Sequence, residues 1–234
     1  MAKYYITNQV YSHRVRLITD QMLVRAVILG VEHDCIEELR QLYAYDGTDT
    51  FVERYSQWDD YRFLARFSDD SFSSSYCAKM LNALKCRRLY KQVFEANLMH
   101  FGDSARNLIE PSDDLRSRIE GLAAEAISPE LQVEVDPLEV ICYTYGQKAI
   151  WPGSGDQMGG MLVDEDGGPR PFEQRSTFCQ SIEAMRSERF IGIIAPVVFE
   201  NDVERDRLRR ALLDPLHAAI ARAVEAPHQK ECSE

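Results

Sequence analysis

Residues 3–29, KYYITNQVYSHRVRLITDQMLVRAVIL, carry the pattern that decides the fold. Apolar side chains recur every three or four residues along this stretch, at Tyr11, Val15, Ile18, Met22, Ala26 and Leu29. This spacing puts them on one face of a long helix, which we expect to end at Gly30. A helix start normally has a Ser, Thr, Asp or Asn cap, but Lys3, Tyr4 and Tyr5 stand there. We therefore expect that the helix starts upstream of this chain.

The helical period continues along the first half of the chain. Residues 32–44 repeat it and end at an Asp-Gly turn signal. Ser56, with Asp59 three residues later, resembles a capping box before another apolar run. The spacing also predicts helices over residues 73–94 and 112–127. The part before Pro129 is thus expected to be nearly all helix.

The pattern changes after Pro129. Residues 131–137, LQVEVDP, alternate apolar and polar side chains, and residues 139–145, EVICYTY, are rich in β-branched and aromatic ones. Residues 190–199, FIGIIAPVVF, predict a further strand, and residues 201–226 predict a helix capped by Asn201 or Asp202.

The predicted fold class is therefore a mainly α N-terminal part followed by a small α+β C-terminal unit. We place the domain boundary between a helical region, residues 1–128, and an α+β subdomain, residues 129–234. A helix near residues 176–185 and a loop over residues 151–160, WPGSGDQMGG, belong to the second part. The loop lacks the Gly-Lys-Ser/Thr of a phosphate-binding loop and predicts a hairpin connection.

Composition excludes several classes of protein. The formal net charge of −11 argues against binding nucleic acid by phosphate neutralisation. No apolar stretch approaches the roughly 20 residues that span a bilayer, and the first residues lack the basic region, apolar run and small-residue cleavage site expected of a signal peptide. The six cysteines form no C-x-x-C pair, so we expect reduced, mostly buried thiols. We predict a cytoplasmic protein that binds neither membrane nor nucleic acid.

Two sequence motifs invite a catalytic interpretation. His33-Asp34 has the form of the metal-binding pair of HD hydrolases, yet no other histidine stands at ligand spacing. We favour the simpler interpretation, in which Asp34 complements the dipole at the start of the helix that follows. A nucleophilic Cys77 or Cys86 would need a histidine oriented beside it, and the sequence supplies none. Residues 205–210, RDRLRR, favour a solvated helix face.

Cationic side chains gather in the opening segment. Lys3, His13, Arg14 and Arg16 accompany the ring of Tyr11, a combination suited to a nucleotide. The cations would bind phosphate and the ring would contact sugar or base. A solvated helix face is the alternative that the residues alone leave open.

The same segment resembles a known family. Residues 3–23, KYYITNQVYSHRVRLITDQML, resemble the stretch aRyyMyxqVYxHKtxRxxexML of HD-domain phosphohydrolases of the deoxynucleoside triphosphate triphosphohydrolase type. That group includes bacterial dGTPase-like proteins and the mammalian SAM-and-HD-domain dNTP hydrolase. Three further stretches follow in the family's order, similar to its mdDxxll, RxLyKxv and lxxedGxxxpleexS segments: WDDYRFL (58–64), CRRLYKQVF (86–94) and MLVDEDGGPRPFEQRS (161–176).

The resemblance implies substrate contacts at two positions. Lys3 stands where the family has an arginine that contacts substrate phosphates, so charge is kept and bidentate geometry is lost. Tyr11 matches the tyrosine that packs against the deoxyribose. Ser12 replaces a glutamine of the mammalian member, a change within the region of sugar recognition.

The resemblance also implies allosteric nucleotide contacts. His13 and Arg14 fall on a His-Lys pair that contacts an allosteric nucleotide between subunits in the mammalian enzyme. Arg87 and Lys91 match positions that contact the activating nucleotide there. Spacing alone would make Arg87 and Lys91 a pair on one exposed helix face.

The family's metal ligands, H…HD…D, lie upstream of the opening stretch. The resemblance therefore implies the downstream part of such a hydrolase, catalytically incomplete alone, with no cofactor in this chain and a divalent metal in the full family member. We expect dNTP or GTP binding, and a homo-oligomer because the apolar stripe of residues 3–29 would lack packing partners. The alternative is a stand-alone nucleotide-binding regulatory module that partners an intact HD subunit.

Overall fold

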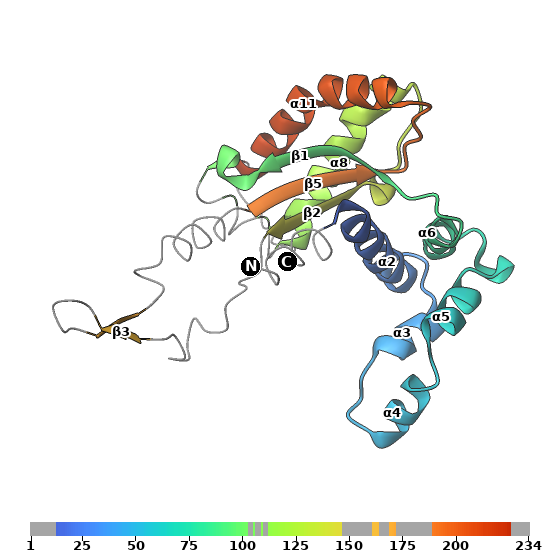
Figure 1. Ribbon diagram of the computed structural model, residues 1–234. Helices are drawn as coiled ribbons and strands as arrows, with labels where there is room; N and C mark the ends of the chain where they lie inside the picture. Colours follow the sequence, from blue (N-terminus) through green and yellow to red (C-terminus); the bar gives the residue numbers. More distant parts are fainter. Residues whose placement is uncertain are drawn as a thin grey trace, which may run out of the picture. The chain divides into compact units, whose positions relative to one another are not determined.

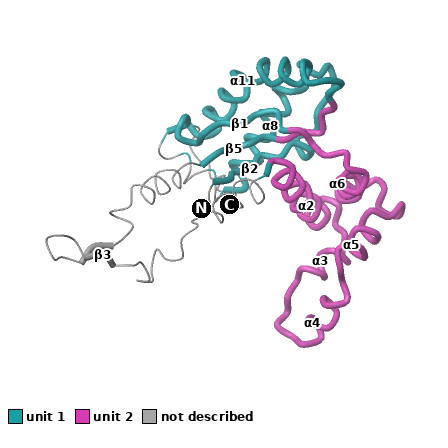
Figure 2. Tube along the Cα trace, in the orientation of Figure 1, with its two compact units in different colours: residues 1–13, 92–193, 199–234 teal, residues 14–91, 194–198 magenta. Residues whose placement is uncertain are grey.

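The structure, a computed structural model, describes residues 13–102, 105, 109, 112–146, 161–163, 169–171 and 189–225. The chain divides into two compact units (Figure 2). We call residues 14–91 with 194–198 the helical unit. Residues 1–13, 92–193 and 199–234 form the second, which we call the sheet unit.

The helical unit is built around one long helix. Its elements are α2 (Arg14–Glu32), α3 (Glu37–Tyr43), α4 (Asp49–Tyr55), α5 (Asp60–Phe67), the 3-10 helix η2 (Asp70–Phe72) and α6 (Tyr76–Lys85). Helix α2 packs along α6 (Figure 1). The buried residues of α2 include Ile18, Met22, Ala26 and Leu29, which confirms these four positions of the predicted stripe. Val15 shares this face by its spacing but is 48% exposed, so the packed part of the stripe begins at Ile18.

Gly30 does not end α2, contrary to the prediction. The helix runs on to Glu32, and the chain then turns at Cys35, which has a φ of 53°. A Cβ atom at Gly30 would lie 2.5 Å from Leu39 Cδ2 and 3.1 Å from Cys77 Cβ. Glycine is needed here because two other elements approach the helix backbone, and not because the helix stops.

The cap of α5 is one turn away from the predicted one. Asp59 is the N-cap, and its carboxylate accepts a hydrogen bond from Arg62 N at 2.7 Å. Ser56 ends α4 instead and donates to Glu53 O. Helix α5 buries Phe67 completely.

The predicted helix over residues 73–94 is wrong in its second half. Helix α6 ends at Lys85, and Arg87 adopts a left-handed conformation with a φ of 55°. The chain then runs beside α2, where the Tyr90 N–H contacts Met22 Sδ at 3.4 Å. From Lys91 it forms strand β1 (Lys91–Asn97), which buries Val93 and Phe94. The first half of the chain is therefore not all helix.

The sheet unit consists of a small sheet with two long helices. Its remaining elements are η3 (Leu98–Phe101), α8 (Asp113–Leu131), η4 (Pro137–Glu139), β2 (Ile141–Gly146), β3 (Met161–Val163), β4 (Pro169–Pro171), β5 (Arg189–Ala195) and α11 (Asp202–Glu225). The three-stranded sheet has the order β1-β5-β2 and is antiparallel (Figure 1). Helices α8 and α11 pack against each other, and α8 also packs on β2. Strands β3 and β4 form an antiparallel pair with Leu162 opposite Arg170.

A tyrosine fills the centre of the sheet. A Cβ atom at Gly192 of β5 would lie 2.6 Å from Tyr143 Cζ of β2, so the ring occupies the space that a side chain would need. Gln92 of β1 donates from Nε2 to the Tyr143 hydroxyl at 3.4 Å. The side chain of Tyr143 thus joins all three strands.

Helix α8 confirms the prediction for residues 112–127 and extends it. Ser112 caps it, and it continues to Leu131, after which Gln132 is left-handed with a φ of 54°. The strand predicted over residues 131–137 is therefore wrong, because the helix end and η4 occupy this stretch. The Glu120 carboxylate of α8 accepts a hydrogen bond from Cys142 N of β2 at 2.9 Å.

Helix α11 agrees with its predicted pattern. Asn201 provides the cap, because its Oδ1 accepts a hydrogen bond from Glu204 N at 2.9 Å. Leu208, Leu212 and Leu216 are buried on one side. Strands β2 and β5 likewise confirm the two β-branched runs, although β5 stops at Ala195 before Pro196.

The predicted fold class is confirmed: helices followed by a small α+β unit. The boundary between residues 128 and 129 stays a prediction, and Pro129 lies within α8. Lys3, Tyr11, the loop over residues 151–160 and the helix near residues 176–185 lie outside the described residues.

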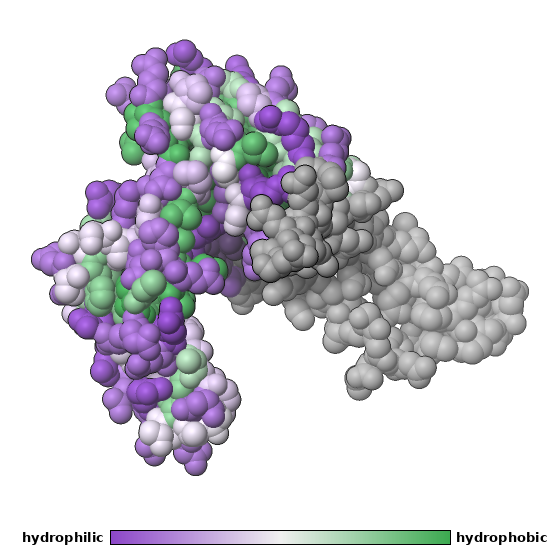
Figure 3. Space-filling view, turned by 180° about the vertical axis from the view of Figure 1, so that it is seen from behind, coloured by the Kyte–Doolittle hydropathy of each residue, from purple (hydrophilic) through white to green (hydrophobic). Residues whose placement is uncertain are grey.

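The described surface is mainly hydrophilic when the molecule is seen from behind, with apolar residues in small groups (Figure 3). Within the described ranges, no helix has the length and apolarity to span a membrane.

Candidate functional site

The His33-Asp34 pair joins the end of α2 to the start of α6. The Asp34 side chain is 6% exposed, and its Oδ2 accepts a hydrogen bond from Cys77 N at 2.9 Å. His33 lies beside it, with Nδ1 3.3 Å from Asp34 Oδ1 and its ring edge-on to Tyr76 at 4.8 Å. A carboxylate at a helix N-terminus pairs with unsatisfied N–H groups and with the helix dipole. Asp34 thus complements the dipole of α6. The sequence instead predicts that it complements the helix that directly follows it in the chain.

A metal ion does not fit this pair. One carboxylate oxygen of Asp34 is occupied by the Cys77 N–H and the other contacts His33. No group of three or more His, Cys, Asp or Glu side chains that could hold an ion occurs in the described part of the chain. The geometry gives His33 and Asp34 a role in packing α6 against α2.

Cys77 is held as a thiol. It is fully buried, and burial, with the charge of Asp34 adding to it, raises the pKa of Cys77 to about 12. The thiolate is the nucleophilic form of cysteine, so this side chain is inert near neutral pH. Cys86, by contrast, is exposed at the end of α6.

Four exposed cationic side chains lie within seven residues of one another, from the last residue of α6 to the first residue of β1. We call Lys85, Arg87, Arg88 and Lys91 the basic segment. Within the described ranges none of these four side chains forms an ion pair. Arg87 lies in the left-handed turn and Lys91 is the first residue of β1. The two therefore do not share a helix face, in contrast to what their spacing alone suggests. Unpaired cations at this density form a surface that favours a multivalent anion.

The packing of α2 on α6 places the basic segment toward the start of α2. Gly30, near the end of α2, lies against Cys77 at the start of α6. Tyr90, beyond the end of α6, contacts Met22. The chain from α6 to Tyr90 therefore returns along α2 toward its N-terminus. Arg14 lies about two turns, or roughly 12 Å, further along α2 than Met22.

Within the helical unit, the chain path thus places Arg14 and the basic segment toward the same end of α2. His13 and Arg14 are exposed at the start of α2. Arg16 forms the predicted pair with Asp20, at 3.5 Å. Lys3 and Tyr11, the predicted substrate contacts, lie outside the described residues.

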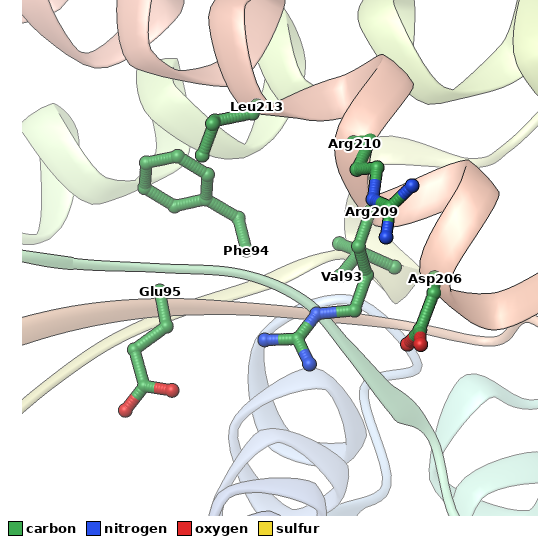
Figure 4. A pocket seen from close by; sticks show the side chains of 7 residues that line it. All are labelled: Val93, Phe94, Glu95, Asp206, Arg209, Arg210 and Leu213. Atoms are coloured by element: carbon green, nitrogen blue, oxygen red, sulfur yellow. The ribbon is translucent and has the colours of Figure 1, made fainter. Parts of the chain in front are cut away.

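A pocket lies in the sheet unit between β1 and α11 (Figure 4). Residues 93–95 of β1 line one side, and Asp206, Arg209, Arg210 and Leu213 of α11 line the other. The pocket has a volume of about 260 Å³. Sequence reasoning missed it because residues 91–94 were expected to be helical, and RDRLRR was interpreted as a solvated face. The position of β1 beside α11 is needed to show that two of these arginines, Arg209 and Arg210, border a cavity.

Comparison with known proteins gives one family. The sequence profile of the family described as "HD associated region" matches residues 1–217. Among curated proteins none matches. A phosphohydrolase from Bacteroides thetaiotaomicron has a similar structure, with 14% identity and a TM-score of 0.45. The match covers 83% of this chain and 48% of the other, so the chain spans about half the length of that protein. The family match extends over most of the sequence, and the chain belongs to the HD-associated region family.

Proposed function

We propose that this chain is the C-terminal portion of an HD-family dNTP phosphohydrolase, in which it contributes nucleotide-contacting and subunit-contacting residues. The observation that carries the proposal is the basic segment, four exposed cations without ion pairs in the described structure of a chain with a net charge of −11. In an acidic protein such a local excess of positive charge favours one anionic ligand over general polyanion binding.

The chemistry of the basic segment suits a nucleoside triphosphate. Arg87 and Arg88 offer planar guanidinium groups that bind phosphate oxygens in pairs, and Lys91 offers a compact charge. Like charges this close repel one another, and a bound polyphosphate relieves the repulsion. His13 and Arg14 are proposed to contact a second nucleotide between subunits, and Lys3 and Tyr11 the substrate, as the resemblance implies.

We also propose that the chain alone does not hydrolyse nucleotides. Hydrolysis in this family relies on metal ions that polarise phosphate and activate water. The arrangement of His33 and Asp34 supports this, because Asp34 contacts the α6 backbone with one oxygen and His33 with the other. The divalent metal is proposed to belong to the complete protein.

Replacing Arg87 and Lys91 by alanine is expected to weaken dGTP binding by about tenfold or more. One charge-assisted hydrogen bond contributes about 1.5 kcal/mol, which is about tenfold in Kd. Isothermal titration calorimetry of the full chain at low salt measures the change, and chromatography of the same samples with Mn²⁺ measures hydrolysis. We expect binding without turnover.

Arg118→Ala is the matched control, since Arg118 is an exposed arginine on α8 in the sheet unit. It should leave the Kd for dGTP within about twofold, well below the effect of a lost charge-assisted contact. An unchanged Kd in the double variant would disprove the binding proposal. Robust production of deoxyguanosine would disprove the proposal of catalytic incompleteness.

The described part of the predicted apolar stripe is buried against α6, so it does not supply the free surface on which the predicted homo-oligomer rested. Self-association is proposed instead through the outer side of α2. Leu23, Val24 and Ile28 are between 40% and 52% exposed, and exposed apolar groups of this kind favour protein contacts. Light scattering at micromolar concentration should show an oligomer, and Val24→Glu with Ile28→Glu should shift it to monomer. Val52→Glu on α4, at an equally exposed valine, should not. A monomeric unmodified chain would contradict the proposal.

A further inference from the structure

The outer side of α2 is symmetric about its middle. Leu23 and Ile28, which are 40% and 43% exposed, lie equally far on either side of a midpoint between residues 25 and 26. Val24, which is 52% exposed, and the half-buried Val27 are equally spaced about the same midpoint. A surface that meets its own copy around a two-fold axis must be complementary to itself. This apolar spacing meets that condition when two α2 helices run in opposite directions and the axis passes through the midpoint.

The two ends of α2 carry charges that oppose its dipole. The N-terminal end of a helix favours acidic side chains, and the C-terminal end favours basic ones. Helix α2 has no acidic residue in its first turn and no basic residue in its last turn. Arg14 is its first residue and Glu32 its last, and both side chains are exposed. Each end of α2 therefore has a charge of the wrong sign for its dipole.

An antiparallel second copy brings opposite charges together at both ends. With the axis at the midpoint, Glu32 of one copy lies level with Thr19 of the other. The helical rise puts this level about 7.5 Å from that of Arg14, which extended arginine and glutamate side chains can span. The nearby Asp20 is already paired with Arg16 at 3.5 Å. The carboxylate of Glu32 then lies beside the positive end of the other helix, where an acidic group is stabilising.

We propose that two copies of this chain associate through antiparallel α2 helices related by a two-fold axis. Leu23, Val24 and Ile28 form the centre of the contact, and Arg14 of each copy lies beside Glu32 of the other. This inference rests on the self-association in the proposed function and specifies its geometry. The contact involves only the helical unit and does not include the basic segment. A two-fold interface of this kind is closed, so it produces a dimer.

Exchange of the two end charges tests this geometry. Arg14→Glu should weaken dimerisation about tenfold at low salt, because each dimer contains the contact twice. Adding Glu32→Arg to the same chain should restore the affinity of the unmodified protein. The two positions lie about 27 Å apart along one helix, so they cannot pair within a chain. Restored affinity, measured as the dimer Kd by sedimentation equilibrium of the full chain, therefore reports a contact between two antiparallel copies.

Arg118→Glu and Glu125→Arg are the matched controls. They make the same charge changes at exposed side chains of α8, in the sheet unit, and should leave the dimer Kd within about twofold. Both α2 substitutions suit the helix dipole better than the residues they replace, so the variants should stay folded, which circular dichroism verifies.

Parallel α2 helices would place Arg14 beside its own copy, and Arg14→Glu would then leave the dimer Kd unchanged. That result, or a double variant that stays as weak as Arg14→Glu, would overturn the antiparallel geometry. Dimers of the unmodified chain would in both cases still support the proposed self-association. A monomeric unmodified chain would disprove both proposals.

Discussion

Phe67→Ala should lower the free energy of unfolding of the helical unit by about 3–5 kcal/mol, the range for removing a buried aromatic ring. Phe67 is completely buried at the end of α5. Its ring lies 5.6 Å from that of Trp58, 5.0 Å from that of Phe63 and 6.2 Å from that of Phe72. Alanine would leave a cavity among three rings that cannot all move into it. Urea unfolding monitored by tryptophan fluorescence and by circular dichroism measures the loss.

Tyr61→Ala provides the comparison on the same helix. The Tyr61 side chain is 82% exposed, so its removal should change the free energy of unfolding by less than about 0.5 kcal/mol. Similar effects of the two substitutions would show that the aromatic cluster around Phe67 does not form the core of this unit.

Asp34→Ala should lower the free energy of unfolding by about 2–3 kcal/mol, since a buried N–H loses its charged acceptor. The Cys77 N–H in the first turn of α6 would be left without the carboxylate 2.9 Å away. The start of α6 should then open more often and expose the Cys77 thiol. The rate of reaction of Cys77 with a thiol reagent, measured in a chain whose other cysteines are replaced by serine, should rise together with the loss of stability.

His33→Ala distinguishes this role from that of a metal ligand. The His33 side chain is 51% exposed, so its removal should cost less than about 1 kcal/mol. Neither substitution should alter Mn²⁺ affinity in equilibrium dialysis. A large loss of Mn²⁺ binding in either variant would show that the pair holds a metal after all.

Sequence patterns predict those elements whose signals are local. Asn201 caps α11 and its leucines follow at helical spacing, so both signals lie within the element itself. The β-branched runs of β2 and β5 are equally self-contained. The helix predicted over residues 73–94 failed because helical spacing continues past Lys85, where contact of Tyr90 with Met22 imposes a different path. Gly30 was misinterpreted for a related reason, since Leu39 and Cys77 come from other elements.

The functional residues likewise divide into those with a local signal in the sequence and those whose role depends on other elements. A run of cations is visible in the sequence, and the structure leaves Arg87 and Lys91 exposed. The partner of Asp34 is 43 residues away, and no local pattern indicates it. The pocket between β1 and α11 needs a strand beside a helix from the end of the chain, so Arg209 and Arg210 could not be distinguished from solvated neighbours.

The strand order β1-β5-β2 has a consequence for biosynthesis. The middle strand is the last of the three to leave the ribosome, and neither outer strand has its neighbour until then. Helices α2, α3, α5 and α6 contact one another within the helical unit, precede β5 in the sequence, and can assemble on the nascent chain. Until β5 is synthesised, β1 and β2 therefore have backbone edges without a partner strand, and other strands can pair with these edges incorrectly. Chains interrupted before residue 189 should accordingly be substrates for chaperones and proteases.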